Sequence, residues 1–334
     1  MATLTITARA YQGETDLQPI ADLLNECEHT DQEDSYYSAS DLALGYAEPG
    51  FDPHQNVWLW ERVGRLVAYA DLGIPAPEAI DTSIDCFLWF RVHPDERWQG
   101  LETEILAWAE QRLLAEVKHL ATAGAAVETL PIQLTVGCRD HQVERIAFYE
   151  SQGFVYERCF LTMTCRLDNP VPNPVLPDGY RIVQSRGAED AAAWIEMYNQ
   201  TFIDHWRFHP ALLEEHLYWL STPVYSPELD LVATAPDGSF AAFCLGYIDR
   251  EFNQQKHRRE GWIGSLGTRR GFRRQGLARA MLLAGLQKLQ AAGMDTAKLA
   301  VDTQNPNAAQ TLYESVGFRK LHAQFSYTRQ LRLT

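Results

Sequence analysis

Apolar positions in the second half of the chain recur with the period of an amphipathic helix. Such side chains, three or four positions apart, predict a helix over 188–202. The side chains that fall near its apolar face are Ala192, Ile195, Tyr198 and Phe202. Similar patterns predict helices over 277–292, ended by Gly293, and over 308–315.

Short apolar or alternating runs between these helices predict strands. The predicted strands are 180–183, 229–235, 240–248, 262–268, 298–302 and 325–331. The second and third flank Pro236-Asp-Gly, which is a turn signal, so they predict a hairpin. The order of elements predicts an α/β or mixed α+β fold, in which helices flank a mixed, mostly antiparallel sheet.

The two halves of the chain carry the same landmarks in the same order. Residues 92–101, VHPDERWQGL, correspond to residues 268–277, TRRGFRRQGL. Further on, residues 147–154, AFYESQGF, correspond to residues 311–318, TLYESVGF. A repeat of this length predicts two tandem copies of one domain rather than a solenoid.

A proline-rich segment separates the two copies. Residues 169–179, NPVPNPVLPDG, contain four prolines and cannot continue a helix or a central strand. We therefore predict a first domain over 1–168, a linker over 169–179 and a second domain over 180–334.

Composition narrows the class of protein. The 334 residues carry a net charge of −15, which repels nucleic acid and favours small cationic partners such as amines. No apolar stretch is long enough to span a membrane, and the first ten residues lack a secretion signal. The six cysteines suit neither zinc nor a disulfide framework. We expect a cytoplasmic protein without metal, as a monomer or weak homodimer.

The strongest chemical signal is the turn RRQGLA, residues 273–278, between a predicted strand and a predicted helix. A helix start offers unpaired N–H groups and the positive end of the dipole, which together bind anions. Gly276 and Ala278 leave room for a phosphate to approach the backbone. Arginines crowd this turn, and arginine suits phosphate. These arginines are Arg269, Arg270, Arg273, Arg274 and Arg279.

With these residues the sequence resembles the GCN5-related N-acetyltransferase (GNAT) family. The family signature R/Q-x-x-G-x-G/A is matched by Arg273, Gly276 and Ala278. A second signature is matched by residues 305–318, NPNAAQTLYESVGF. The resemblance covers both halves, and the tandem layout is similar to the mycothiol synthase group.

The resemblance implies acetyl-CoA as the acyl donor and direct attack by the amine of a small acceptor in a ternary complex. Backbone groups of the turn would hold the pyrophosphate, the preceding strand would pair with the pantetheine arm, and one of two asparagines would bind that arm from the other side. The implied donor-binding residues are Leu266, Gly267, Thr268, Arg273, Arg274, Gln275, Gly276, Leu277, Ala278, Asn305 and Asn307. Tyr313 would act as the general acid toward the departing thiolate.

The acceptor side is less well defined by the sequence. A protonated amine must lose a proton before attack, and the family often places a carboxylate on the strand before the turn. Glu260 is the nearest candidate for this base. The resemblance also places acceptor residues near Asp204, His205 and Trp206, which could equally belong to the core and cap a helix.

The first copy departs from the signature. Glu102 stands where the family has glycine or alanine, and no asparagine matches Asn305. We therefore interpret the first domain as a degenerate copy. The alternative for this domain is an intact second site. For the function of the whole chain, the alternatives are a GNAT scaffold that binds acyl-CoA or a protein partner without turnover, and an enzyme that transfers a longer acyl group.

Overall fold

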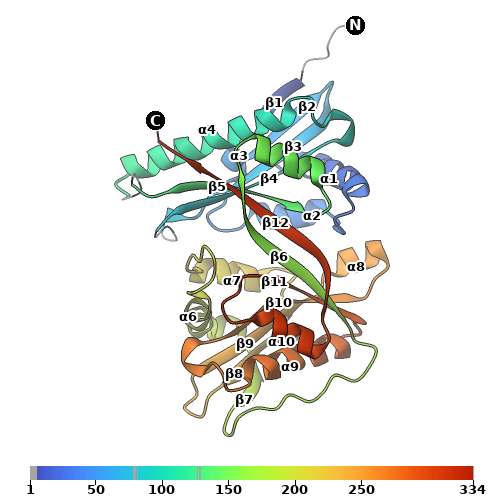
Figure 1. Cartoon of the computed structure of the whole chain (residues 1–334), viewed down its shortest axis with the longest axis vertical. Coiled ribbons are helices and arrows are strands. Elements are labelled where there is room, and N and C mark those ends of the chain that lie inside the picture. The colour runs from blue at the N-terminus through green and yellow to red at the C-terminus, as the bar shows by residue number, and fades with distance from the viewer. Residues whose placement is uncertain (1–5, 78–79, 81, 126, 128, 334) are drawn as a thin grey trace. The chain divides into compact units, whose positions relative to one another are not determined.

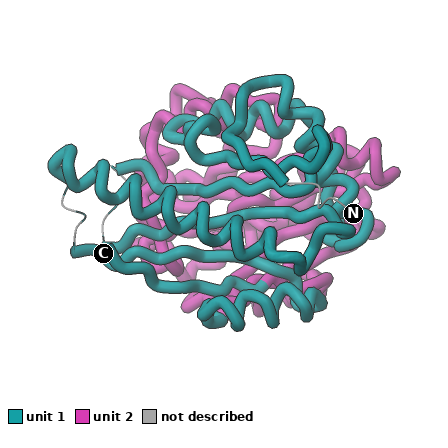
Figure 2. The backbone as a smooth tube through the Cα atoms, turned by 90° about the horizontal axis from the view of Figure 1, so that it is seen from above, with its two compact units in different colours: residues 1–157, 325–334 teal, residues 158–324 magenta. Residues whose placement is uncertain are grey.

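The computed structural model describes residues 6–77, 80, 82–125, 127 and 129–333. The chain forms two compact units, one of residues 1–157 with 325–334 and the other of residues 158–324 (Figure 2). We call them the N-terminal unit and the C-terminal unit. Among the described residues no helix is both long and apolar enough to cross a membrane.

The N-terminal unit is one sheet with helices around it (Figure 1). Its strands lie in the order β1-β2-β3-β4-β5-β12. Their bounds are Ile6–Ala10, Val57–Arg62, Arg65–Gly73, Ile84–Val92, Ile132–Arg139 and, for β12, Arg319–Leu331, of which residues from Phe325 belong to this unit. The α-helices are α1 Leu17–Asp31, α2 Ala39–Tyr46, α3 Pro53–Asn56, α4 Leu101–Thr122 and α5 Val143–Ser151.

The C-terminal unit repeats this plan. Its strands lie in the order β6-β11-β10-β9-β8-β7. Their bounds are Val155–Arg166, Thr296–Asp302, Glu260–Thr268, Phe240–Tyr247, Asp230–Thr234 and Arg181–Gln184. The α-helices are α6 Ala191–Phe202, α7 Leu213–Ser221, α8 Arg250–Lys256, α9 Leu277–Ala291 and α10 Ala309–Val316. The predicted fold, in which helices flank a mixed and mostly antiparallel sheet, is confirmed. Among the assigned pairs of described strands, only β4–β5 and β10–β11 are parallel.

The last strand of each sequence repeat leaves its own repeat. β6 follows α5 in the chain, yet its residues 160–166 pair with β11 of the C-terminal unit. β12 follows α10, yet its end belongs to the N-terminal unit, where Thr328 Oγ1 lies 3.2 Å from Thr135 Oγ1 of β5. The units are therefore not divided at residues 168 and 180, where the sequence suggested domain boundaries. Residues 167–180 contain neither helix nor strand, and Val171 and Asn169 bond to Gln290 of α9.

In each unit the two central parallel strands pair over only part of their length. β10 and β11 pair from Glu260–Thr296 to Ile263–Leu299, and β10 then continues five residues to Thr268 without pairing to β11. β4 and β5 likewise pair only as far as Phe87–Thr135. The fourth and fifth strands of each copy are therefore unpaired with each other beyond these ladders.

Side chains pack directly against glycine backbone where α9 meets the sheet. A Cβ on Gly261 of β10 would lie 2.5 Å from Leu289, and one on Gly285 of α9 would lie 2.4 Å from Cys244 Sγ. Only glycine permits this approach. In the second half of the chain the sequence patterns located the strands and α9 to within two residues, apart from β12, which begins six residues earlier, but they missed α7 and α8.

Candidate active site

The turn between β10 and α9 has an unusual backbone and an open surface. Arg274 and Gly276 both have positive φ, 66° and 85°. Gly276 directly precedes α9, and no side chain caps the helix. A Cβ added to Gly276 would meet no atom within 4 Å. The first N–H groups of α9 therefore face open space at the positive end of the helix dipole, which is the geometry of an anion site.

Arg273 organises the base of this turn. Its Nε donates to the carbonyl of Thr268 at 3.2 Å, and its Nη2 donates to the carbonyl of Thr201, in α6, at 2.8 Å. The guanidinium thus ties the end of β10 to the end of α6. Gln275 accepts a hydrogen bond from the Tyr180 hydroxyl at 3.2 Å, and Leu277 is buried beneath the turn.

The five arginines around the turn differ in their partners. Arg269 pairs with Glu196 at 2.7 Å, and Arg270 pairs with Asp204. Arg279 donates to Ser315 Oγ at 2.7 Å and has no acidic partner among the residues that the structure describes. Arg274 also has no acidic partner among the described residues, and its side chain makes no hydrogen bond to a described side chain. Positive charge near the turn is therefore only partly neutralised.

Above the unpaired parts of β10 and β11, the C-terminal unit exposes the middle of its sheet. Gly264 and Ala300 are exposed although they lie on central strands, and Leu266 is half-buried. Leu266, Gly267 and Thr268 pair with β9 on one side, and the β10–β11 ladder ends before them on the other. Thr268 Oγ1 is buried and has no hydrogen-bond partner among the residues that the structure describes. These features fit an extended ligand with amide groups, such as a pantetheine arm, beside β10.

Tyr313 lies on α10 with its ring packed edge-on against Phe318, 6.0 Å between ring centres. Burial, and secondarily the nearby Cys244, raise the pKa of Tyr313 to about 12. The phenol therefore keeps its proton at neutral pH. Its hydroxyl makes no hydrogen bond to any described residue, whereas the hydroxyl of Tyr149, the matching residue of the N-terminal unit, donates to the Gly137 carbonyl at 3.4 Å.

The two candidate asparagines have different roles in the loop before α10. Asn305 Oδ1 accepts a hydrogen bond from the Asn307 N–H at 2.8 Å, so it shapes the turn. The Asn307 side chain is exposed and bonds to no described residue. Asn307 is therefore the freer of the two to bind a ligand.

Glu260 does not have the surroundings of a general base. Its carboxylate lies 2.5 Å from Lys298 Nζ and 3.3 Å from Arg258 Nη1. It is also buried at the end of β10 that pairs with β11, away from the unpaired residues 264–268. Two cations therefore already contact this carboxylate, at the paired end of the strand. The expectation that Glu260 serves as the base is therefore not supported by its contacts.

The three predicted acceptor residues lie on the segment between α6 and α7, with different partners. Asp204 pairs with Arg270 and, at 3.3 Å, with Arg273, and these arginines hold the pKa of Asp204 below its usual value. Trp206 packs against Phe160 of β6 with 5.7 Å between ring centres. His205 Nδ1 lies 3.3 Å from the Trp206 carbonyl. Asp204 thus holds this segment against the arginines of the turn at 270–278, while Trp206 packs against β6.

The N-terminal unit has the same turn with a carboxylate bound in it. Trp98 and Gly100 have positive φ, 60° and 108°, as do Arg274 and Gly276. Here, however, Glu102 Oε1 accepts the backbone N–H of Trp98 at 2.9 Å. Glu102 is only 3% exposed. Its carboxylate occupies a donor that the corresponding turn of the C-terminal unit leaves open.

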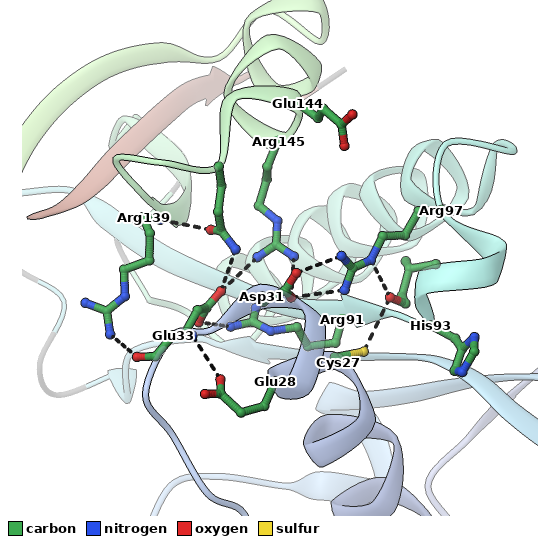
Figure 3. Close-up of polar contacts among 12 residues, drawn as sticks. Cys27, Glu28, Asp31, Glu33, Arg91, His93, Arg97, Arg139, Glu144 and Arg145 are labelled. Carbon is green, nitrogen blue, oxygen red and sulfur yellow. Dashed lines mark hydrogen bonds and ion pairs between the residues drawn. The ribbon is translucent and has the colours of Figure 1, made fainter. Parts of the chain in front are cut away.

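Charged side chains also fill the region beside this turn (Figure 3). Arg97 forms a bidentate pair with Asp31 at 2.7 and 3.0 Å, and Arg91 pairs with Glu33 at 2.6 Å. Arg145 of α5 lies 3.5 Å from both acids. The position of Arg91 corresponds to Gly267, and the exposed Ala300 corresponds to the buried Val136. The network crosses from α1 to α5 over the unpaired part of β4.

Sequence reasoning identified Glu102 but not this network. Its members are far apart in the chain, since Asp31 and Arg145 are separated by 114 positions. The one available signal was the arginine at position 91, where the second copy has glycine. An arginine inside an apolar strand requires a buried acidic partner.

The match to a protein-family model lies within the C-terminal unit. Residues 191–318 match the model of the Acetyltransferase (GNAT) family. A mycothiol acetyltransferase of Thermobispora bispora is 31% identical over 180 residues, which are 53% of this chain and 59% of that relative. The chain thus spans less than two thirds of that relative.

Solved structures resemble the whole chain. A GCN5-related N-acetyltransferase from Sphaerobacter thermophilus is 26% identical, with a TM-score of 0.75 over 98% of this chain and 96% of that one. A tandem GNAT protein from the clavulanic acid biosynthesis pathway is 15% identical, with a TM-score of 0.70 over 98% of both chains. The similarity to the tandem GNAT protein shows the fold alone. That fold is the tandem arrangement of two domains that the repeated landmarks predicted.

Proposed function

We propose that this chain transfers an acetyl group from acetyl-CoA to the amine of a small molecule, because residues 191–318 match the model of the GNAT family. The observation that carries this proposal is the open turn at 273–278 beside the unpaired, exposed part of β10. The relative named mycothiol acetyltransferase supports a small-molecule acceptor.

The residues of the C-terminal unit suggest how the donor is held. The N–H groups at the start of α9 and the charge of Arg274 bind the pyrophosphate, and Gly276 gives it access to the backbone. Main-chain groups of Leu266 to Thr268 and the side chain of Asn307 hold the pantetheine arm. The donor supplies a thioester, whose carbonyl carbon accepts the amine.

Transfer occurs by direct attack in a ternary complex. A C–N bond forms between the amine and the acetyl carbon, the C–S bond breaks, and its electron pair goes to sulfur. Tyr313 donates its hydroxyl proton to that sulfur and is reprotonated from solvent. The amine loses its proton to water, since Glu260 is paired with Lys298. Trp206 and His205 form part of the acceptor wall, and Asp204 holds their segment in place.

A thiol-release assay with acetyl-CoA and a panel of small amines tests the proposal. We expect thiol release that depends on both substrates, and thermal stabilisation of the protein by acetyl-CoA alone. Stabilisation without thiol release from any amine would indicate a binding module. No stabilisation at millimolar acetyl-CoA would contradict the proposal, and higher turnover with a longer acyl-CoA would replace acetyl with that group.

A further inference from the structure

The N-terminal unit holds a carboxylate in the middle of β3 that the proposed acetyl transfer does not use. Asp71 is half-buried and faces Trp89 of β4 in the strand register. Its Oδ2 accepts the Tyr69 hydroxyl at 2.7 Å, and the Tyr69 oxygen accepts the Tyr46 hydroxyl at 2.9 Å. One carboxylate oxygen is thus fixed by a chain of two phenols from β3 and α2.

The other oxygen of Asp71 is available. Oδ1 accepts no hydrogen bond from any residue that the structure describes, and Asp71 has no ion pair within the same part of the chain. Arg91 acts on it through space, but its guanidinium is bound to Glu33 and lies 4.6 Å above the Trp89 ring. Asp71 is therefore a carboxylate without its own counterion.

The fold does not require a charge at this position. The main-chain hydrogen bond from His93 to Val67 is equivalent to the bond from Arg269 to Ala241 in the second repeat. Counted from these bonds, the residue of the second repeat that corresponds to Asp71 is Leu245. Leu245 packs against the apolar cluster beneath α6. A half-buried carboxylate costs stability where leucine would contribute packing, so its presence points to a role in binding.

We propose that Asp71 and Trp89 form a binding site in the N-terminal unit for a small ammonium ligand with an apolar or aromatic body. The ammonium group donates to Asp71 Oδ1 and supplies the missing positive charge. The Trp89 ring, which packs 5.6 Å from the rings of both Tyr37 and Tyr69, covers the apolar body. The phenols keep the carboxylate oriented.

The site has a pH dependence of defined sign. Burial raises the pKa of Asp71 to about 7, against the opposing effects of the Tyr69 hydrogen bond and Arg91. The groups packed around it are Tyr69 on its own strand, Trp89 and Arg91 on β4, Tyr46 on α2 and Val57 on β2. Because the ammonium ligand needs the ionised carboxylate, affinity rises with pH, by roughly tenfold from pH 6 to pH 8.

Calorimetry on the full chain tests the site with benzylamine as the probe, benzyl alcohol as its neutral counterpart and no acetyl-CoA. We expect benzylamine to bind and benzyl alcohol not to bind. The affinity for benzylamine should be about tenfold or more weaker in Asp71→Asn. It should be unchanged in Asp95→Asn, because the Asp95 side chain is 85% exposed. Tyr46→Phe keeps the ring and is expected to weaken binding by a smaller factor.

The proposal is overturned if Asp71→Asn binds benzylamine as wild type does, if benzyl alcohol binds equally well, or if wild type does not bind the amine at pH 8. Should Asp71→Asn fail to fold, the pH dependence and Tyr46→Phe decide the matter. Because no acyl donor is present, these outcomes are independent of whether acetyl transfer is observed.

Discussion

The turns at residues 97–102 and 273–278 share a backbone and differ in the groups that bind to it. Both have positive φ at their second and fourth residues, and both hold their first arginine against the end of the preceding strand, through Val92 in one and Thr268 in the other. In the N-terminal unit Glu102 binds the turn and Arg91 fills the space beside it. In the C-terminal unit Ala278 places no carboxylate in the turn, and Thr201 and Phe243 fill the space at Gly267, where a Cβ would lie 2.4 Å and 2.7 Å from them.

This difference shows that the two copies keep the same turn backbone while different groups contact it. The fold needs the arginine, the turn and the start of the helix, so both copies retain them. An acid bound in the turn satisfies the N–H groups and the helix dipole as a phosphate would. We therefore infer that Glu102 excludes a phosphate from this turn and stabilises the turn by the same contact.

The largest effect is expected from Ala278→Glu, which gives the C-terminal turn the carboxylate of the N-terminal turn. The added acid would bind the N–H groups of the turn and repel phosphate, so acetyl-CoA binding should fall below detection by calorimetry. Ala278 has no strained backbone, which makes it a cleaner position than Gly276 with its φ of 85°. Wild-type affinity in this variant would contradict the assignment of the turn.

Tyr313→Phe is expected to have the next largest effect. Removal of the proton donor should lower turnover by roughly 10²–10⁴-fold and leave the Kd for acetyl-CoA nearly unchanged. Tyr149→Phe is the matched control, since it removes the corresponding hydroxyl from the N-terminal unit. Steady-state kinetics and calorimetry on both variants measure the comparison, and equal turnover in the two would remove Tyr313 from the reaction.

Glu102→Ala is expected to act on stability rather than on acetyl-CoA binding. The Trp98 N–H would lose its buried acceptor, which costs about 1–3 kcal/mol in the free energy of unfolding. Denaturant unfolding measures this loss, and calorimetry should still find one site for acetyl-CoA. Loss of that site would mean that the N-terminal turn, not the C-terminal one, binds the donor.

Asp204→Asn is expected to give the smallest effect. The pair with Arg270 is exposed, so removing the charge should raise KM for the amine by no more than about fivefold, with little change in the Kd for acetyl-CoA. Glu196→Gln, which removes the exposed partner of Arg269 on α6, is the control and should leave KM unchanged. Equal effects of the two variants on KM would show that the segment 203–212 does not depend on Asp204.

The sequence by itself determined the repeat, the strands and helices around the turn at 273–278, and that turn as a candidate phosphate site. These features are local, because each can be recognised within one short segment of the sequence. They are the period of the apolar positions, the glycine before a helix and the six-residue signature at 273–278. The contrast between Ala278 and Glu102 was visible for the same reason, and the structure added that Glu102 binds the Trp98 N–H.

The tertiary structure alone decided which distant residues meet. It exchanged the last strands of the two repeats, paired Glu260 with Lys298, and attached Asp204 to Arg270. It also left Asp71 without an ion pair among the residues that the structure describes. A lone carboxylate looks the same in the sequence whether it is paired, exposed or isolated, because its partner is chosen by packing across the chain and not by its neighbours.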